Sequence, residues 1–257
     1  MPRIVVHEGA MSLVSAPDVD AVLFDAGMTL LEPVLPVAEI YLQEARELGT
    51  EVPQDEFVER LRGLWPKLAS EYRSAHPELE CSEEMELQGW WRFTHELSRP
   101  FATLHEQHDE WLARLFQRFD DPQTWKTTPG ALACLEACRE EGREAAIVSN
   151  WHSSLHGILR GHGLDQFVTF TLTSAEIGRK KPHREIFQAA LDQLGVNASS
   201  VVHIGDSWEE DVLGAAALGI RPVHLAKQRA ASTDCPSAAW VRSLEDFRVA
   251  KLKTMNR

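Results

Sequence analysis

The sequence has few cysteines, and its basic residues are well outnumbered by acidic ones. Its four cysteines, Cys81, Cys134, Cys138 and Cys235, are scattered and form no CxxC pair, which argues against a disulfide scaffold. We therefore expect reduced thiols and a cytoplasmic location. Lys and Arg number 26 against 39 Asp and Glu, a formal net charge of −13. This balance provides no general basic surface for nucleic acid, although one lysine and a cation can still make a positive pocket for a small phosphorylated molecule.

Long apolar runs, internal repeats and flexible linkers are also lacking. The N-terminal apolar residues are interrupted by His7 and Glu8 before they form a secretory signal, and no apolar stretch approaches membrane-spanning length. We expect a protein that is neither exported nor inserted in a membrane. With 257 residues, of which 44% are hydrophobic, the chain can bury a substantial core without disulfides or structural metals.

What the sequence does contain is a series of short apolar runs typical of buried parallel strands. The first, Ala21–Phe24, stops at Asp25, as a strand does where its carboxyl end leaves the sheet. Similar runs follow at Ala145–Val148, Phe167–Leu172, Val201–Ile204 and Pro222–Leu225. Helical patterns ending at glycines lie between the later runs, at Ser153–Gly163, His183–Gly195 and Glu209–Gly219. This alternation predicts an α/β fold with a doubly wound parallel sheet.

The interval between the first two strands is different, because it is acidic and helical in period. Its helical segments are separated by prolines and lie at Val37–Gly49, Gln54–Ala75, Ser82–Ser98 and His105–Phe119. This is too much chain for one crossover helix, so we predict an inserted helical domain over residues 33–125. The α/β core then comprises residues 19–32 and 126–257, and residues 1–18 form an N-terminal extension.

Short hinges near Glu32–Pro36 and Trp125–Pro129 are predicted to join the insert to the core. The insert contains four of the eight tryptophans, Trp65, Trp90, Trp91 and Trp111. We predict that they form the core of a small helical bundle. The alternative is that Trp90 or Trp91 faces a substrate.

Polar residues stand where the apolar strands end. Asp25 follows the first strand, Ser149 the second and Asp206 the fourth, and Lys181 lies in a loop shortly after the third. Ligands of open parallel sheets bind at this edge. Carboxylates hold a divalent cation, a lysine neutralises phosphate charge and a hydroxyl donates to a phosphate oxygen. The set therefore indicates a metal-assisted reaction at phosphorus.

Four segments, in this order and spacing, resemble the motifs of the haloacid dehalogenase-like hydrolase superfamily. They are FDAGMTLL (Phe24–Leu31), IVSNW (Ile147–Trp151), KKPHREIF (Lys180–Phe187) and HIGDSWEEDVLGAAALGI (His203–Ile220). The likeness covers essentially the whole chain. The helical insert after the first motif is similar to that of the subgroup whose helical cap closes over the active site. The resemblance implies a Rossmann-like core with such a cap.

The resemblance also implies a role for each matching residue. Asp25 is the expected nucleophile, forming an aspartyl intermediate, and Lys181 is expected to hold Asp25 and the phosphate together. The residues expected to bind the substrate phosphate are Met28, Thr29, Ser149, Asn150 and Lys181. The ligands expected for Mg²⁺ are Asp25, Asp206 and the main-chain carbonyl of Gly27, and Asp211 is expected to support the loop or the lysine.

Position 27 departs from the family's phosphatase pattern. Phosphatases of this superfamily usually carry a second aspartate there, which protonates the leaving group and activates water, whereas this chain has Gly27 followed by Met28. We expect slower proton transfer, by about 10²- to 10⁴-fold for poor leaving groups. Either the cap or the substrate supplies the acid, or the leaving group needs none, or the protein is a weak or inactive member.

Three functions remain open from sequence. The first is Mg²⁺-dependent, phosphatase-type hydrolysis of a small phosphorylated metabolite, the second is a binding or regulatory role without efficient catalysis, and the third is dehalogenase or phosphonatase chemistry. Asp206 argues against the third, as does the absence of arginine from residues 32–45, where dehalogenases bind a halide or carboxylate. We expect no nucleic-acid or membrane partner, and a monomer or homodimer.

Overall fold

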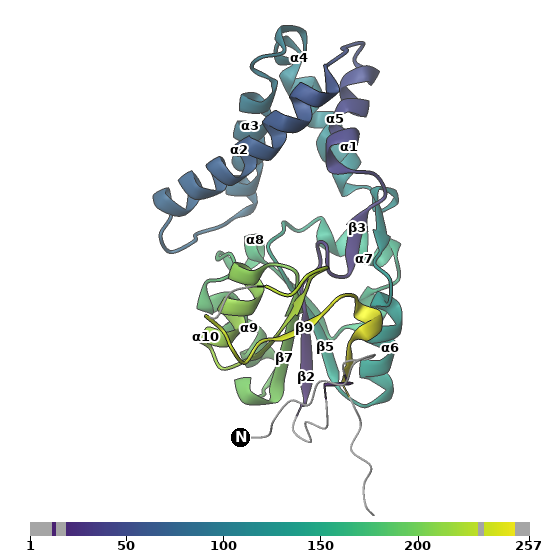
Figure 1. The fold of residues 1–257 in the computed structure, drawn as a ribbon, viewed down its shortest axis with the longest axis vertical. Coiled ribbons are helices and arrows are strands. Elements are labelled where there is room, and N and C mark those ends of the chain that lie inside the picture. The colour runs from purple at the N-terminus through teal and green to yellow at the C-terminus, as the bar shows by residue number, and fades with distance from the viewer. Residues whose placement is uncertain (1–11, 14–18, 231–233, 250–257) are drawn as a thin grey trace, which may run out of the picture.

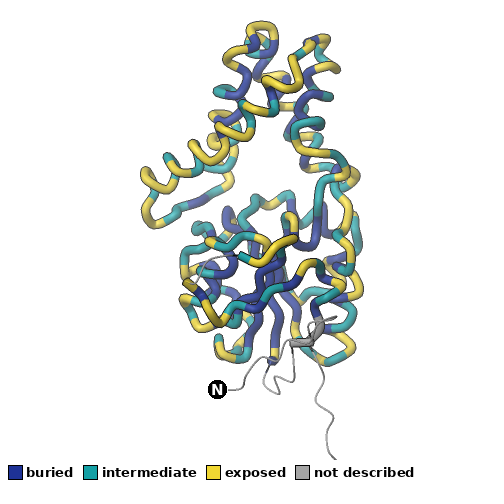
Figure 2. The backbone as a smooth tube through the Cα atoms, viewed as in Figure 1, coloured by how far each residue is buried: buried dark blue, intermediate teal, exposed yellow. Residues whose placement is uncertain are grey.

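The computed structural model describes residues 12–13, 19–230 and 234–249. Its centre is a parallel sheet of six strands in the order β6-β5-β2-β7-β8-β9. The strands are β2 (Ala21–Phe24), β5 (Glu144–Ser149), β6 (Phe170–Thr173), β7 (Val201–Gly205), β8 (Arg221–Leu225) and β9 (Ala239–Val241). The first strand, β2, therefore lies between β5 and β7, with the buried backbone of the sheet at the centre of the core (Figures 1 and 2).

Helices cover both faces of this sheet (Figure 1). On one face α6 (Ala131–Glu140) and α7 (Leu155–Gly161) pack on Val22 and Phe24. On the other, α9 (Arg184–Leu194) and α10 (Gly214–Ala217) pack on Ala21 and Leu23. Because alternate residues of a strand point to opposite faces, every residue of β2 is buried. The predicted α/β class with a doubly wound parallel sheet is confirmed.

Shorter elements complete the core. They are α8 (Ser174–Ile177) and the turns η1 (Pro122–Thr124), η2 (Asp165–Phe167), η3 (Ala198–Ser200), η4 (Trp208–Leu213) and η5 (Leu244–Asp246). Of the predicted N-terminal extension, residues 1–18, only β1 (Ser12–Leu13) is described, and it pairs with β10 (Arg248–Val249). The remainder of that segment lies outside the described residues. No helix among the described residues is long and apolar enough to cross a membrane.

Two expectations for the core were inaccurate in detail. The strand predicted at Phe167–Leu172 begins only at Phe170, because Asp165–Phe167 form a turn. The helix predicted at Glu209–Gly219 is divided into the π-helical turn η4 and the α-helix α10. Single π-turns widen a helix locally and are frequent at functional sites, and this one contains Asp211.

The insert is a bundle of α1 (Val37–Glu47), α2 (Gln54–Ala75), α3 (Glu83–Ser98), α4 (Ala102–Glu106) and α5 (His108–Asp120). It lies beyond the carboxyl ends of the strands (Figure 1), as a helical cap on the core would. One helix predicted at His105–Phe119 is interrupted at Gln107, whose side-chain Oε1 accepts a hydrogen bond from Thr50 Oγ1 at 2.8 Å. This hydrogen bond connects the break between α4 and α5 to the segment that follows α1.

The tryptophans of the insert do not all belong to its core. Trp111 is fully buried, and its ring centroid lies 5.7 Å from that of Tyr41. Trp90 is partly buried against the same cluster. Trp65 and Trp91 are 61% and 46% exposed, so the prediction of a core position was wrong for these two.

Insert and core are joined by paired strands where short hinges were predicted. β3 (Leu31–Pro33) and β4 (Trp125–Thr127) form an antiparallel pair at the two crossing points. A second junction lies between the α2–α3 loop and the loop after α8. There Cys81 N–H donates to Gly178 O at 3.0 Å and Lys180 N–H donates to Leu79 O at 2.9 Å. The insert therefore contacts the core at these two separate junctions.

We expect the stability of the protein to depend on pH through His108, a buried residue of the insert. Burial, opposed by Asp109 but aided by His95 and His105, lowers the pKa of His108 below its ordinary value of 6.5. As pH falls below that value, the unfolded chain binds a proton that the folded chain does not. We expect the free energy of unfolding to fall by up to about 1.4 kcal/mol per pH unit from this residue. Melting temperatures from pH 7.5 to 5 should fall less steeply for His108→Gln, and equal slopes would contradict the assignment.

Candidate active site

Asp25, Ser149 and Asp206 meet at one edge of the sheet. Asp25 directly follows β2, Ser149 ends β5 and Asp206 directly follows β7, and β2 is paired with both of the other strands. The Asp25 N–H donates to Ile204 O at 2.9 Å, which extends the pairing with β7 and fixes the backbone of Asp25. Only 6% of Asp25 is exposed. The strand order therefore brings together residues that are more than a hundred positions apart in the chain.

Asp25 is held by a buried lysine and a buried hydroxyl. Its Oδ1 accepts hydrogen bonds from Lys181 Nζ at 2.7 Å and from Ser149 Oγ at 2.9 Å. Lys181 is 2% exposed and donates also to Asp211 Oδ1 at 2.6 Å. Both hydrogen bonds that the Asp25 carboxylate accepts from the described residues end on Oδ1. Its Oδ2 is therefore the oxygen that remains available for a substrate or a cation.

Asp211 serves as the second anchor of Lys181. Its Oδ1 lies 2.9 Å from His203 Nε2, and its Oδ2 accepts from Ser207 N–H at 3.0 Å. A Cβ at Gly205 would stand 2.2 Å from Asp211 Cγ, so this close approach requires glycine. With both oxygens engaged, Asp211 is placed to orient the lysine rather than to bind a substrate.

The electrostatics of the cluster follow from two opposite effects. Burial, together with the nearby Asp211, raises the pKa of Asp25, while the Lys181 charge opposes this. For Asp211 the balance is opposite. Burial raises its pKa, but Lys181 and the His203 hydrogen bond outweigh burial and hold the pKa below the ordinary range. Burial lowers the pKa of Lys181, but the two carboxylates overcome it and raise that pKa. The lysine is therefore cationic between two acidic groups.

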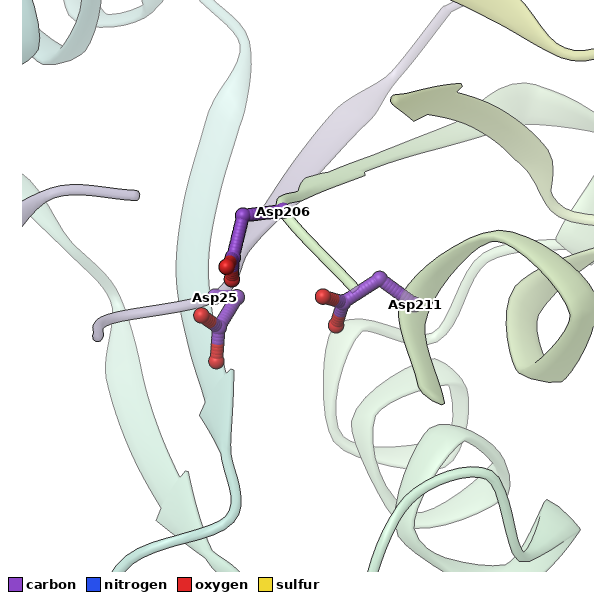
Figure 3. Close-up of side chains that lie close together, drawn as sticks. All are labelled: Asp25, Asp206 and Asp211. Carbon is purple, nitrogen blue, oxygen red and sulfur yellow. The ribbon is translucent and has the colours of Figure 1, made fainter. Parts of the chain in front are cut away.

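Asp206 has the features of a cation ligand. Its carboxylate lies beside that of Asp25, with Asp211 opposite (Figure 3), and ligand oxygens of all three lie within 4.8 Å of one another. Asp206 is exposed as a whole residue, but its carboxyl group has lost much of its hydration. This desolvation, followed by repulsion from Asp25 and Asp211, raises the pKa of Asp206 to about 7. A divalent cation would relieve this repulsion, and carboxylate oxygens are its preferred ligands. The donor set therefore fits a metal ion held by Asp25 and Asp206.

Asn150, predicted to bind the substrate, contacts the lysine loop in this structure. Its Oδ1 accepts from Lys181 N–H at 2.6 Å and its Nδ2 donates to Lys181 O at 3.1 Å. Nδ2 also donates to Glu210 Oε2 at 3.0 Å. With all of its amide groups engaged, Asn150 is suited to position Lys181, and a substrate contact stays a prediction.

The first-motif residues Gly27, Met28 and Thr29 form a tight turn after Asp25. Met28 has a left-handed backbone with φ of 56°, is 55% exposed, and its N–H donates to Leu31 O at 2.7 Å. Thr29 is completely buried, and its Oγ1 has no hydrogen-bond partner among the described residues. The predicted contacts of Met28 and Thr29 with phosphate, and of the Gly27 carbonyl with Mg²⁺, stay predictions.

Three residues of this site were missed from sequence. His203 is completely buried in β7 and contacts Asp211, Glu210 contacts Asn150, and Trp151 lies against Gly27. The signal for His203 was a polar residue inside an apolar strand, which is costly to bury without a partner. The others carried no such signal, because their roles depend on loops that meet only in the folded chain.

The residues and their arrangement can be compared with known proteins. The family model of the haloacid dehalogenase-like hydrolases matches residues 19–219, which includes the sheet strands up to β7, the insert and the acidic cluster. The chain belongs to this family. Helices α2–α5 of the insert are consistent with the cap of its helical-cap subgroup.

Relatives within the family share the sequence to different extents. The chain is 32% identical over 230 residues to haloacid dehalogenase-like hydrolase domain-containing protein 3 of Danio rerio, covering 88% of this chain and 93% of that protein. It is 36% identical over 96 residues to a ribulose-1,5-bisphosphate 5-phosphatase of Halopiger xanaduensis, covering 37% of this chain and 40% of that one. The chain is thus similar to hydrolases of this family, including a phosphatase.

Solved structures confirm the family's fold. The crystal structure of a dehalogenase has a TM-score of 0.67 at 23% identity, covering 90% of this chain and 96% of that one. The HAD-hydrolase YfnB of Bacillus subtilis, bound to magnesium, has a TM-score of 0.64 at 19% identity, covering 89% and 96%. At these identities the likeness establishes the architecture alone.

Proposed function

We propose that this hydrolase is a Mg²⁺-dependent phosphatase acting on a small phosphorylated molecule through an aspartyl intermediate. The observation that supports this proposal is the asymmetric hydrogen bonding of the Asp25 carboxylate. One carboxylate oxygen is fixed by Lys181 and Ser149, at 2.7 and 2.9 Å, and the other accepts no hydrogen bond from the described residues. Ligand oxygens of Asp25 and Asp206 lie within 4.8 Å of each other. This arrangement aims a buried carboxylate at an electrophile and keeps a cationic group next to it.

The reaction follows from these contacts. A carboxylate oxygen of Asp25 attacks phosphorus, and the bond from phosphorus to the leaving oxygen breaks, with the electron pair staying on that oxygen. Lys181 and Ser149 stand where they can stabilise the charge of the transferred group. Water then attacks phosphorus of the aspartyl phosphate and releases inorganic phosphate and Asp25. A cation held by Asp25 and Asp206 would offset phosphate charge in both steps.

Metal dependence separates this proposal from dehalogenase chemistry, which needs no metal. We expect the purified protein to hydrolyse an aryl phosphate in the presence of Mg²⁺, to lose this activity with EDTA and to release no halide from a 2-haloacid. Halide release that is unaffected by EDTA would overturn the proposal. Absence of turnover on aryl, acyl and alkyl phosphates would instead favour the binding or regulatory role.

Mg²⁺ should also be detectable without catalysis, because a ligand that binds only the folded state raises its stability. At a concentration of about 100 times its Kd, Mg²⁺ adds about 2.7 kcal/mol. We expect thermal melts of the wild type to shift upward with Mg²⁺ and those of Asp206→Asn to shift much less. Glu209→Gln, a change at an exposed acid in η4 three residues after Asp206, is the matched control and should respond like the wild type. Equal shifts for Asp206→Asn and wild type would contradict the ligand assignment.

A further inference from the structure

An aromatic ring covers the residue two positions after the nucleophile. A Cβ placed on Gly27 would lie 3.3 Å from Cζ3 and 4.0 Å from Cε3 of Trp151. Trp151 itself follows Ser149 by two residues, on the loop that leaves β5. The indole is therefore next to the two loops that contribute Asp25 and Ser149, and the edge that it turns toward Gly27 consists of carbon atoms.

Trp151 is fixed in this place from several sides. Its carbonyl accepts hydrogen bonds from Ala175 N–H at 3.2 Å and Ser174 Oγ at 3.3 Å. Its ring centroid lies 4.8 Å from that of Trp125, at an interplanar angle of 60°. Trp125 belongs to the strand pair that joins the insert to the core, and its Nε1 donates to Phe119 O at 2.8 Å. The indole thus forms a wall between Gly27 and Trp125 at the junction of insert and core, and a larger residue at position 27 would displace it.

This wall has two consequences for a substrate bound at Asp25. Neither Gly27 nor the carbon edge of the indole can give a proton, so this place favours a leaving group that is stable as an anion. A phenol, with a pKa of about 10 like that of tyrosine, departs far more readily than an aliphatic alcohol. In addition, Trp151 is only partly buried, so aromatic surface remains to contact a flat ring.

We propose that Trp151 is a specificity-determining residue that favours phosphate monoesters of aromatic alcohols. The proposal rests on the proposed phosphatase function for its chemistry, but the binding preference does not require turnover. A favourable ring contact of this kind is worth about a two- to tenfold preference in binding.

The test is calorimetric, with phenylphosphonate and cyclohexylphosphonate as probes in the presence of Mg²⁺. The two probes share the charged group and ring size and differ in aromaticity. We expect Trp151→Leu to weaken phenylphosphonate binding by about two- to tenfold and cyclohexylphosphonate binding much less. Trp151→Phe should retain most of the preference. Trp65→Leu, a change at an exposed tryptophan of the insert, should leave both affinities unchanged.

Any of three results would overturn the proposal. They are equal affinities of the wild type for the two probes, equal weakening of both affinities by Trp151→Leu, and no binding of either probe. Kinetics then separate it from the proposed function. If Mg²⁺-dependent hydrolysis requires Asp25 but shows no aromatic preference through Trp151 in KM, only this inference fails. If the aromatic preference in binding is present while no phosphate is hydrolysed, the phosphatase proposal fails and the binding role of Trp151 stands.

Discussion

Replacing Asp25 by Asn is expected to lower kcat for an aryl phosphate by at least about 1,000-fold, because the amide cannot act as the nucleophile. The effect should fall on kcat rather than on KM, since Lys181 and Ser149 remain to bind the phosphate. Rapid-quench measurements on the wild type should detect phosphate bound to the protein, and the variant should show none. Equal turnover of variant and wild type would refute the nucleophile assignment.

A loss of turnover caused by the missing nucleophile must be distinguished from one caused by unfolding. The charges of the site make this possible. Burial, with Asp211 and against Lys181, raises the pKa of Asp25, so at neutral pH its charge costs the folded state free energy. Asp25→Asn removes that charge, and we expect the variant to melt no lower than the wild type. Asp20→Asn, an exposed aspartate preceding the same strand, is the matched control and should keep wild-type turnover.

Replacing Lys181 by Met is expected to destabilise the fold by about 3 to 5 kcal/mol as well as to abolish turnover, because it leaves Asp25 and Asp211 buried without their common counter-charge. Urea unfolding of the two proteins measures the change directly. The loss of stability should be smaller in acid. There the carboxyl of Asp25, whose pKa is raised, takes up a proton first.

The neighbouring lysine provides a matched control for this substitution. Lys180 pairs with Glu86 at 2.5 Å near the surface, with its side chain 25% exposed. Because partly exposed ion pairs contribute little, we expect Lys180→Met to cost no more than about 1 kcal/mol. If the two variants were destabilised equally, the buried position of Lys181 would not be the cause.

Much of the candidate site followed from the order of residues along the chain. The apolar run Ala21–Phe24 predicts a buried strand, and Asp25 after it predicts a carboxylate at the ligand-binding edge of the sheet. The same reasoning placed Ser149 and Asp206 there, and the structure brings all three to that edge. Such predictions succeed because hydrophobic period and strand ends are local properties.

Details that depend on two distant segments could not be read in this way. Gln107 lies at the break between two helices and accepts a hydrogen bond from Thr50, and the predicted hinges pair as β3 and β4 because the insert returns to its starting point. Neither contact leaves a periodic signal in the sequence. The exposure of Trp65 and Trp91 likewise follows from how the helices of the insert pack, which their hydrophobicity alone does not specify.

The sequence by itself thus determined the α/β class, the inserted helices and the chemical groups Asp25, Ser149, Lys181 and Asp206, because each is encoded within one short segment. Tertiary structure alone decided what surrounds them. Asn150 is bound to the backbone of Lys181, and Trp151 lies over the glycine at position 27. These contacts join segments from separate strands, and their energy exists only once the parallel sheet has placed those strands side by side.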